Sequence, residues 1–157
     1  MKAALKKAFN QNIFTIDSDL ENVKVSEIES GMEKFLTSDA DEAIFQVFTT
    51  KAKLDGLLNR YISFSGIRLI RKNDLKEVLK ENIKGYQLET AINKYFSENH
   101  KKSYFVKCSF INPNKLDKIG FLKGMQNNIK MEISMISYTG VWEHIKQTLF
   151  FARKELK

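Results

Sequence analysis

The sequence contains few of the residues that cross-link a chain or interrupt its regular structure. Its 157 residues include one proline, seven glycines and a single cysteine, Cys108. A lone cysteine cannot close an internal disulfide, which excludes a disulfide scaffold and favours a reducing compartment, so we expect a cytoplasmic protein. The scarcity of proline and glycine excludes a disordered or linker-rich chain.

The usual signatures of catalysis, metal binding and nucleotide binding are missing as well. There is no Gly-x-Gly-x-x-Gly and no Gly-Lys-Ser/Thr sequence, so a phosphate-binding loop is not indicated. His100 and His144 are far apart, and neither has a second ligand at helical spacing, which argues against zinc. No run approaches the about 18 apolar residues of a membrane-spanning helix, and the N-terminus lacks the apolar core of a signal peptide. We expect no cofactor, no metal ion and no membrane partner.

The sequence does have enough apolar residues for one core. The hydrophobic fraction is 43% and includes twelve phenylalanines, and a chain of this length suits a single domain, residues 1–157. Residues 66–71 suit either a short strand or the approach to the next helix. Hydrophobic periodicity predicts helices over 2–11, 26–36, 54–62, 74–83, 88–96, 116–122 and 141–157, and strands over 12–17, 43–50, 103–111 and 130–138.

The predicted strands and helices together indicate the fold class. The segment 43–50 is apolar at almost every position, which is typical of a central strand covered on both faces. Segments 103–111 and 130–138 alternate as half-buried strands do. Ser26 and Glu29 have the spacing of a capping box and predict a helix start at Ser26. We expect an α+β domain with a mixed sheet of three to five strands packed by several helices.

A helix-turn-helix element is expected at residues 74–97. Apolar residues recur at helical spacing on both sides of Gly85, and glycine favours the left-handed conformation that ends a helix. The order helix, turn, helix, strand over 74–111 is similar to that of winged-helix modules. The similarity concerns element order alone, because the roughly twenty residues between the strands 103–111 and 130–138 exceed a short hairpin wing.

Charge is distributed unevenly along the chain. Residues 1–42 carry 5 Lys/Arg and 9 Asp/Glu, a net charge of −4, whereas residues 43–157 carry 21 and 10, a net charge of +11. Within the second part, residues 66–130 have 14 basic and 6 acidic side chains, a net charge of +8. Such asymmetry indicates an anionic partner, although a lysine-rich surface can also serve solubility alone.

The function that this pattern favours is non-catalytic nucleic-acid binding through phosphate contacts. Lysine attracts phosphate without reading bases, and few arginines accompany the lysines here. Lys76, Lys80 and Lys84 recur every four residues and would form one stripe on a helix. A recognition helix over 87–96 would expose Gln87, Glu89, Thr90, Asn93 and Lys94. The full set of candidate nucleic-acid-binding residues is Arg68, Arg71, Lys72, Lys76, Lys80, Lys84, Lys101, Lys102, Lys115 and Lys118.

Two alternatives stay open. The acidic segment 17–42 and the basic remainder could pair between protein chains, as in an inhibitor, an adaptor or a homo-oligomer, and exposed aromatic residues on the C-terminal helix would favour this. A metal-dependent nuclease needs carboxylates at a strand. Asp39, Asp41 and Glu42 only precede the strand 43–50, so this alternative is the weaker one.

Overall fold

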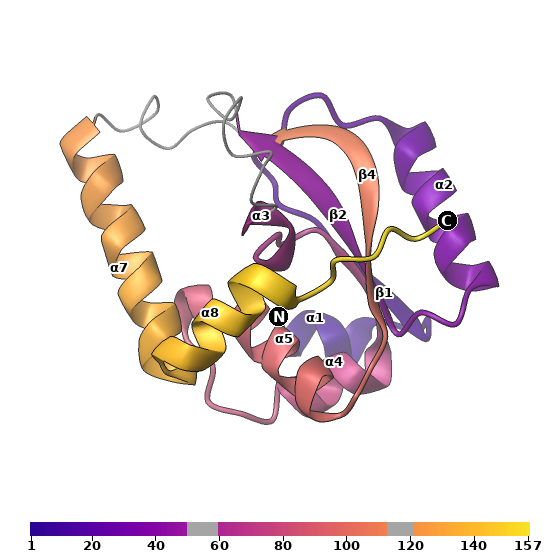
Figure 1. Ribbon diagram of the computed structural model, residues 1–157. Helices are drawn as coiled ribbons and strands as arrows, with labels where there is room; N and C mark the ends of the chain where they lie inside the picture. The colour runs from indigo at the N-terminus through magenta and orange to yellow at the C-terminus, as the bar shows by residue number, and fades with distance from the viewer. Residues whose placement is uncertain (50–59, 113–120) are drawn as a thin grey trace.

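A four-stranded mixed sheet forms the centre of the molecule (Figure 1). The computed structural model describes residues 1–49, 60–112 and 121–157. The strands are β1 (Asn12–Thr15), β2 (Glu42–Thr49), β3 (Arg68–Arg71) and β4 (Ser103–Asn112). They lie in the order β1-β3-β2-β4, with β3 antiparallel to β1 and β2, and β2 parallel to β4. The expected α+β class and mixed sheet are confirmed.

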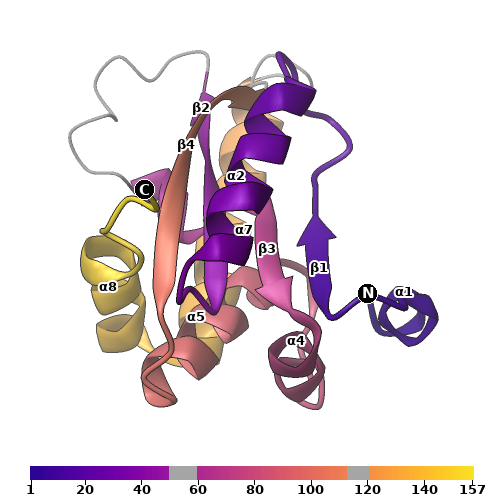
Figure 2. The ribbon, with the colours of Figure 1, turned by 90° about the vertical axis from the view of Figure 1, so that its right-hand side faces the viewer.

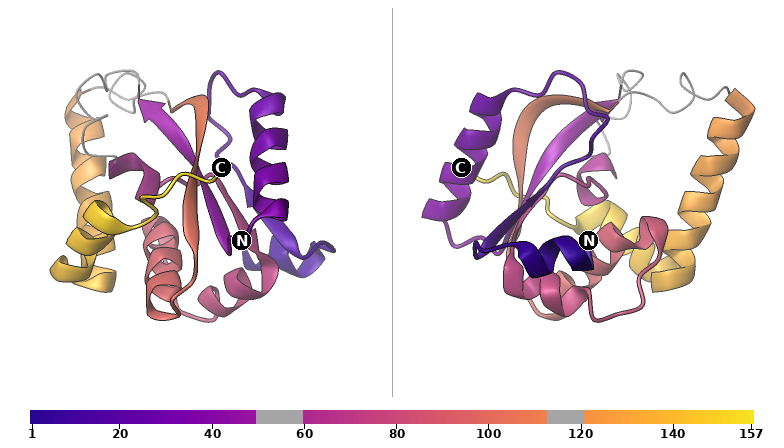
Figure 3. Two further views of the ribbon diagram at one scale, coloured as in Figure 1. Left: turned by 45° about the vertical axis from the view of Figure 1, so that its right-hand side comes forward. Right: turned by 180° about the vertical axis from the view of Figure 1, so that it is seen from behind.

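Helices cover both faces of this sheet, as the views in Figures 2 and 3 show. Helix α2 (Val25–Thr37) lies on one face. The other face carries α1 (Lys2–Lys7), α4 (Lys72–Val78) and α5 (Leu88–Glu98), with the short α3 (Arg60–Ser63) and α8 (Val141–Phe150) beside them. Helix α7 (Phe121–Thr139) contacts α5 and α8 at the margin.

The alternation of side chains along the strands creates two cores. Ala43, Phe45 and Val47 of β2 pack toward α2, whereas Ile44 packs with the helices of the opposite face. Every second residue of β4 from Val106 to Phe110 joins the core beneath α2. The central position of β2 and the half-buried alternation of β4 confirm the strand predictions for 43–50 and 103–111.

The predicted strand 130–138 is wrong, because these residues belong to α7. The alternating residues Met131 and Met135 are also four apart, so a helix places them on one side, and Met135 is buried there. The helix α7 continues from Phe121 through Gly124 to Thr139. The sheet partner of β4 is therefore β2 rather than a neighbouring C-terminal strand.

Other predicted boundaries also shift. Helix α2 begins at Val25, one residue before Ser26, and no side chain caps it. Helix α4 ends at Val78, and the 3-10 helix η2 (Gly85–Gln87) leads into α5. Gly85 does have a positive φ of 52°. The predicted helices 54–62 and 116–122 lie largely outside the described residues.

The arrangement of α4, α5 and β4 differs from that of a winged-helix module. The helical pair α4 and α5 is followed by a strand, but β4 joins the central sheet in parallel with β2, so the described residues form no winged-helix wing. None of the described helices combines the length and the apolar character that crossing a membrane requires.

Candidate functional site

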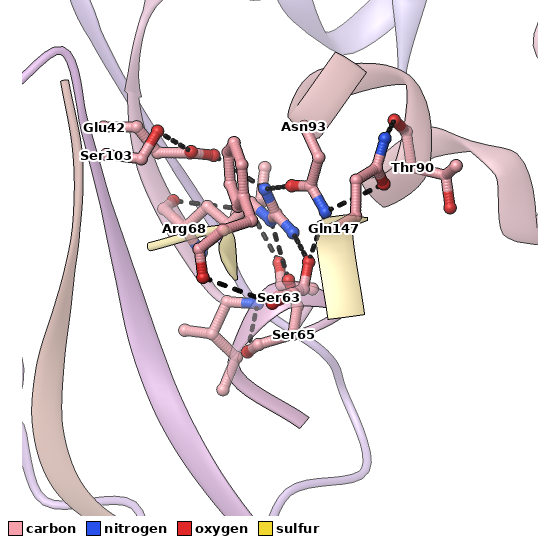
Figure 4. Close-up of polar contacts among 12 residues, drawn as sticks. Glu42, Ser63, Ser65, Arg68, Thr90, Asn93, Ser103 and Gln147 are labelled. Carbon is pink, nitrogen blue, oxygen red and sulfur yellow. Dashed lines mark hydrogen bonds and ion pairs between the residues drawn. The ribbon is translucent and has the colours of Figure 1, made fainter. Parts of the chain in front are cut away.

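Arg68, expected to contact phosphate, is the centre of a buried polar cluster (Figure 4). Its side chain is 1% exposed because even-numbered residues of β3 point toward the helical layer. One guanidinium nitrogen donates to Glu42 Oε1 at 2.8 Å and to Asn93 Oδ1 at 2.8 Å. The other nitrogens donate to the carbonyls of Ser63 and Ser65 at 2.6 and 2.7 Å. Arg68 therefore has a structural role and is not available to a nucleic acid.

The cluster extends across α5 into α8. Asn93 donates to the Ser63 carbonyl at 2.7 Å and to Gln147 Oε1 at 3.4 Å. Gln147 in turn donates to the carbonyl of Thr90 at 3.3 Å. Sheet, α5 and α8 are thus connected by buried hydrogen bonds, which fix their relative positions.

The predicted recognition helix is consequently not a free face. Thr90 and Asn93 are fully buried, and Gln87 donates to the Ser134 carbonyl of α7. The Lys94 ammonium lies 5.7 Å from the centre of the Tyr138 ring, a cation–π arrangement. Helix α5 packs between neighbours on the sides that were expected to contact DNA.

Several other candidate cations are paired with carboxylates. Arg71 lies 3.7 Å from Asp41 and donates to the Ala40 carbonyl, and Lys80 contacts Glu77 at 2.6 Å. Lys101 contacts the buried Asp74 at 3.0 Å, and this hydrogen bond raises the pKa of the lysine. Lys102 contacts Asp39 at 2.5 Å, and the contact raises the pKa of Lys102 and lowers that of Asp39.

These pairs also bear on the nuclease alternative. Asp39, Asp41 and Glu42 each lie beside a cation, respectively Lys102, Arg71 and Arg68. Within the described ranges no group of three or more His, Cys, Asp or Glu side chains could hold a metal ion. Asp39, Asp41 and Glu42 thus each form an ion pair within the described structure.

A second group of lysines surrounds a groove between α1 and α4. The groove has a volume of about 390 Å³ and is lined by four lysines and two leucines: Lys2, Lys6, Lys72, Lys76, Leu5 and Leu79. Lys72 also donates to the Ala8 carbonyl at 2.6 Å, which holds the end of α1. Two of the predicted residues, Lys72 and Lys76, are thus joined by two lysines near the N-terminus that were not among the predicted set.

The remaining predicted lysines are Lys84, Lys115 and Lys118. Lys84 is exposed in the loop before η2, beyond the end of α4, so Lys76, Lys80 and Lys84 do not form one helical stripe. Lys115 and Lys118 lie outside the described residues. Of the predicted basic residues that the structure describes, Arg71, Lys72, Lys76 and Lys101 line one common pocket.

A carboxylate pair that was not predicted lies at the end of β1. Asp17 lies two positions after the last residue of this strand, and Asp19 lies two positions further on. The Asp17 carboxylate packs on Gly66, where an added Cβ would lie 2.7 Å from Asp17 Oδ1. Thr15 donates to the Gly66 carbonyl at 2.7 Å, which holds this loop against β1. In the sequence, the pattern that could have predicted this pair is two aspartates at alternate positions after an apolar strand.

The fold is similar to part of one solved enzyme. No protein-family model and no curated protein matches the sequence. The crystal structure of glucosyl-3-phosphoglycerate synthase from Mycobacterium tuberculosis, in complex with Mn²⁺, UDP-glucose and phosphoglyceric acid, superposes with a TM-score of 0.57 at 16% identity. The similarity covers 88% of this chain and 52% of that chain, so this chain spans about half the length of the enzyme. At this identity the likeness establishes the fold alone.

Proposed function

We propose that this chain forms the metal- and diphosphate-binding part of a site for glycosyl transfer from a nucleotide sugar. The observation that carries the proposal is the Asp17–Asp19 pair at the end of β1, with the Asp17 carboxylate seated on Gly66. The likeness to an enzyme solved with Mn²⁺ and UDP-glucose supports it. The proposal departs from the sequence-based expectation of a non-catalytic protein without a metal.

The donor atoms at this position suit a hard divalent cation. Carboxylate oxygens are ligands that Mn²⁺ and Mg²⁺ prefer. Such ions are commonly bound through one or two carboxylates together with substrate phosphates, so the pair is sufficient without a third protein ligand. When bound, the cation would neutralise charge on the diphosphate leaving group.

The surrounding residues position the pair. Glycine at residue 66 leaves room for the Asp17 carboxylate, because any larger residue would place an atom within 2.7 Å of it. The Thr15 hydroxyl holds the Gly66 segment through its carbonyl, and it also accepts from the Arg68 amide at 3.2 Å. These contacts place the Asp17 carboxylate at one end of the sheet, and Asp19 follows two positions later in the chain.

The first experiment compares two matched aspartate pairs. Asp17→Asn/Asp19→Asn removes the proposed ligands, whereas Asp39→Asn/Asp41→Asn removes two aspartates at the same spacing that lie before β2, away from Gly66. Isothermal titration with Mn²⁺, alone and with UDP-glucose, should show binding that the first variant loses and the second retains. We expect at least a tenfold weakening, equivalent to about 1.4 kcal/mol.

A second variant tests the position rather than the charge. Gly66→Ala should displace the Asp17 carboxylate and weaken Mn²⁺ binding while leaving thermal stability nearly unchanged, since the displaced group is the end of a side chain. Absence of Mn²⁺ binding to the native chain would overturn the metal site. Mn²⁺ binding that UDP-glucose does not strengthen would overturn the diphosphate assignment.

Nucleic-acid binding is the second candidate, and the lysine-lined groove favours it. Four lysines line one groove, and their positive charge would attract phosphate, although the Lys72 ammonium also donates to the Ala8 carbonyl. Of the nucleic-acid-binding residues predicted from the sequence, this candidate site keeps Lys72 and Lys76. It also includes Lys2 and Lys6, which were not predicted. A cytoplasmic location accompanies this proposal, as inferred from the single cysteine.

Fluorescence anisotropy with labelled single- and double-stranded oligonucleotides tests this candidate. Lys72→Gln/Lys76→Gln should weaken binding and reduce the salt slope by about 0.7–0.9 for each phosphate that is no longer neutralised. Lys80→Gln is the matched control, because Lys80 is already paired with Glu77. Equal effects of both variants, or no binding at low salt, would contradict the groove as the site.

A further inference from the structure

Helix α8 has an inverted distribution of polar and apolar residues. Its buried residues are His144 and Gln147, which form hydrogen bonds to Glu132 and to the polar cluster. Its exposed residues are mainly apolar: Val141, Trp142, Ile145, Leu149 and Phe150. Trp142 is 69% and Phe150 73% exposed. An apolar stripe of this size on a helix whose polar side faces the interior marks an interaction surface.

The spacing of the stripe is that of a helix-packing seam. Val141, Ile145 and Leu149 are four residues apart, and Trp142 lies three residues before Ile145. Residues at three and four positions apart share one face of a helix and interlock with a second helix. Trp142, Ile145, Leu149 and Phe150 of the stripe also line a hollow of about 780 Å³ that extends from α8 to the end of α5.

The charges on this face complement a reversed copy of themselves. Glu143 and Lys146 lie 3.9 Å apart beside the stripe. An antiparallel pair of α8 helices centred on Ile145 brings Glu143 of one copy near Lys146 of the other, and the helix dipoles oppose favourably. A parallel pair would place like charges together. An anionic lipid surface would attract Lys146 but repel Glu143.

We propose that α8 is a self-association surface, through which a second copy of this chain docks antiparallel with Ile145 at the two-fold axis. Ile145 then contacts its own copy, and Val141 contacts Leu149 of the partner, as an isologous interface requires. The proposal does not depend on the metal site or on the basic groove. It also differs from pairing of the acidic segment 17–42 with the basic remainder.

Analytical ultracentrifugation from micromolar to millimolar protein tests the dimer. Trp142 is the only tryptophan of the chain, so its fluorescence should shift to the blue as dimers form. Ile145→Lys should make the protein monomeric. Leu36→Lys is the matched control: Leu36 is 66% exposed on α2, which lies across the sheet from α8 in Figure 1, and this variant should still dimerise.

Mixing two charge variants identifies the two-fold contact. Ile145→Lys and Ile145→Glu should each be monomeric, whereas an equimolar mixture should form heterodimers, because residue 145 of one copy meets residue 145 of the other. A native chain that stays monomeric at every concentration would overturn the proposal. So would a dimer that Ile145→Lys leaves intact, or a Trp142 shift that occurs only with anionic phosphatidylglycerol vesicles.

Discussion

Arg68 and Lys72 are four residues apart in the sequence and belong to opposite environments. Arg68 lies in a buried cluster with Glu42 and Asn93, whereas Lys72 borders a groove that is lined by other lysines. Both residues were expected to bind phosphate for the same reason, their positive charge. The density of positive charge along the sequence therefore does not show which cations can bind a partner. A residue on a strand, such as Arg68, can point into the core.

The two regions should also differ in energetics. A buried ion pair gains little net stability, because the cost of desolvation offsets the Coulomb attraction, but removing one partner leaves an uncompensated charge. Lysines whose ammonium groups are solvated contribute little to folding, so in the groove only the hydrogen bond from Lys72 to the Ala8 carbonyl should affect stability. Substitutions in the two regions should separate these behaviours.

The largest effect is expected from Arg68→Met. It leaves the fully buried Glu42 without its cation and should lower the free energy of unfolding by about 3–5 kcal/mol, measured by urea denaturation. In Arg68→Met/Glu42→Met both charges are gone, and much of the stability should return. A double variant that loses the sum of the two single effects would show that the pair is not coupled.

The next effect concerns Asn93. Asn93→Leu removes an acceptor from Arg68 and a donor from the Ser63 carbonyl, and should cost about 1–3 kcal/mol. Asn99→Leu, at the end of the same helix, is the matched control, because Asn99 is exposed and its side chain donates to the nearby Tyr95 carbonyl. It should change stability by no more than about 0.5 kcal/mol. Equal losses would contradict a special role for the buried amide.

A smaller effect is expected in the groove itself. Lys72→Met removes the hydrogen bond to the Ala8 carbonyl and should cost about 0.5–1.5 kcal/mol, with faster amide exchange in α1. Lys76→Met, on the same groove, should leave both the unfolding free energy and the exchange of α1 within error. Unfolding curves and hydrogen exchange on the two variants measure the difference. Protection of α1 that survives Lys72→Met would exclude the proposed anchor.

The smallest effect is a pH dependence at Glu27, which joins α2 to β4. The Ser109 amide donates to its carboxylate at 2.7 Å and lowers the pKa of Glu27 below its usual value. A depressed carboxylate pKa stabilises the fold above the unfolded value of about 4.3, and this contribution is lost as the pH falls through the folded pKa. The native chain should therefore lose more stability on acidification than Glu27→Gln. If the unfolding free energies of the native chain and of Glu27→Gln changed in parallel with pH, the stabilising contact between Glu27 and Ser109 would be contradicted.

The α+β class, the central strand 43–50 and the half-buried strand 103–111 could be predicted from the sequence, because apolar alternation and continuity report directly on burial. Whether 130–138 is a strand could not, since residues two and four apart satisfy both periods over so short a run. The inward orientation of Arg68 and Asn93, the approach of Lys2 to Lys72 and the packing of Asp17 on Gly66 emerged only from the folded chain. Those outcomes depend on contacts between residues distant in sequence, which no local pattern specifies.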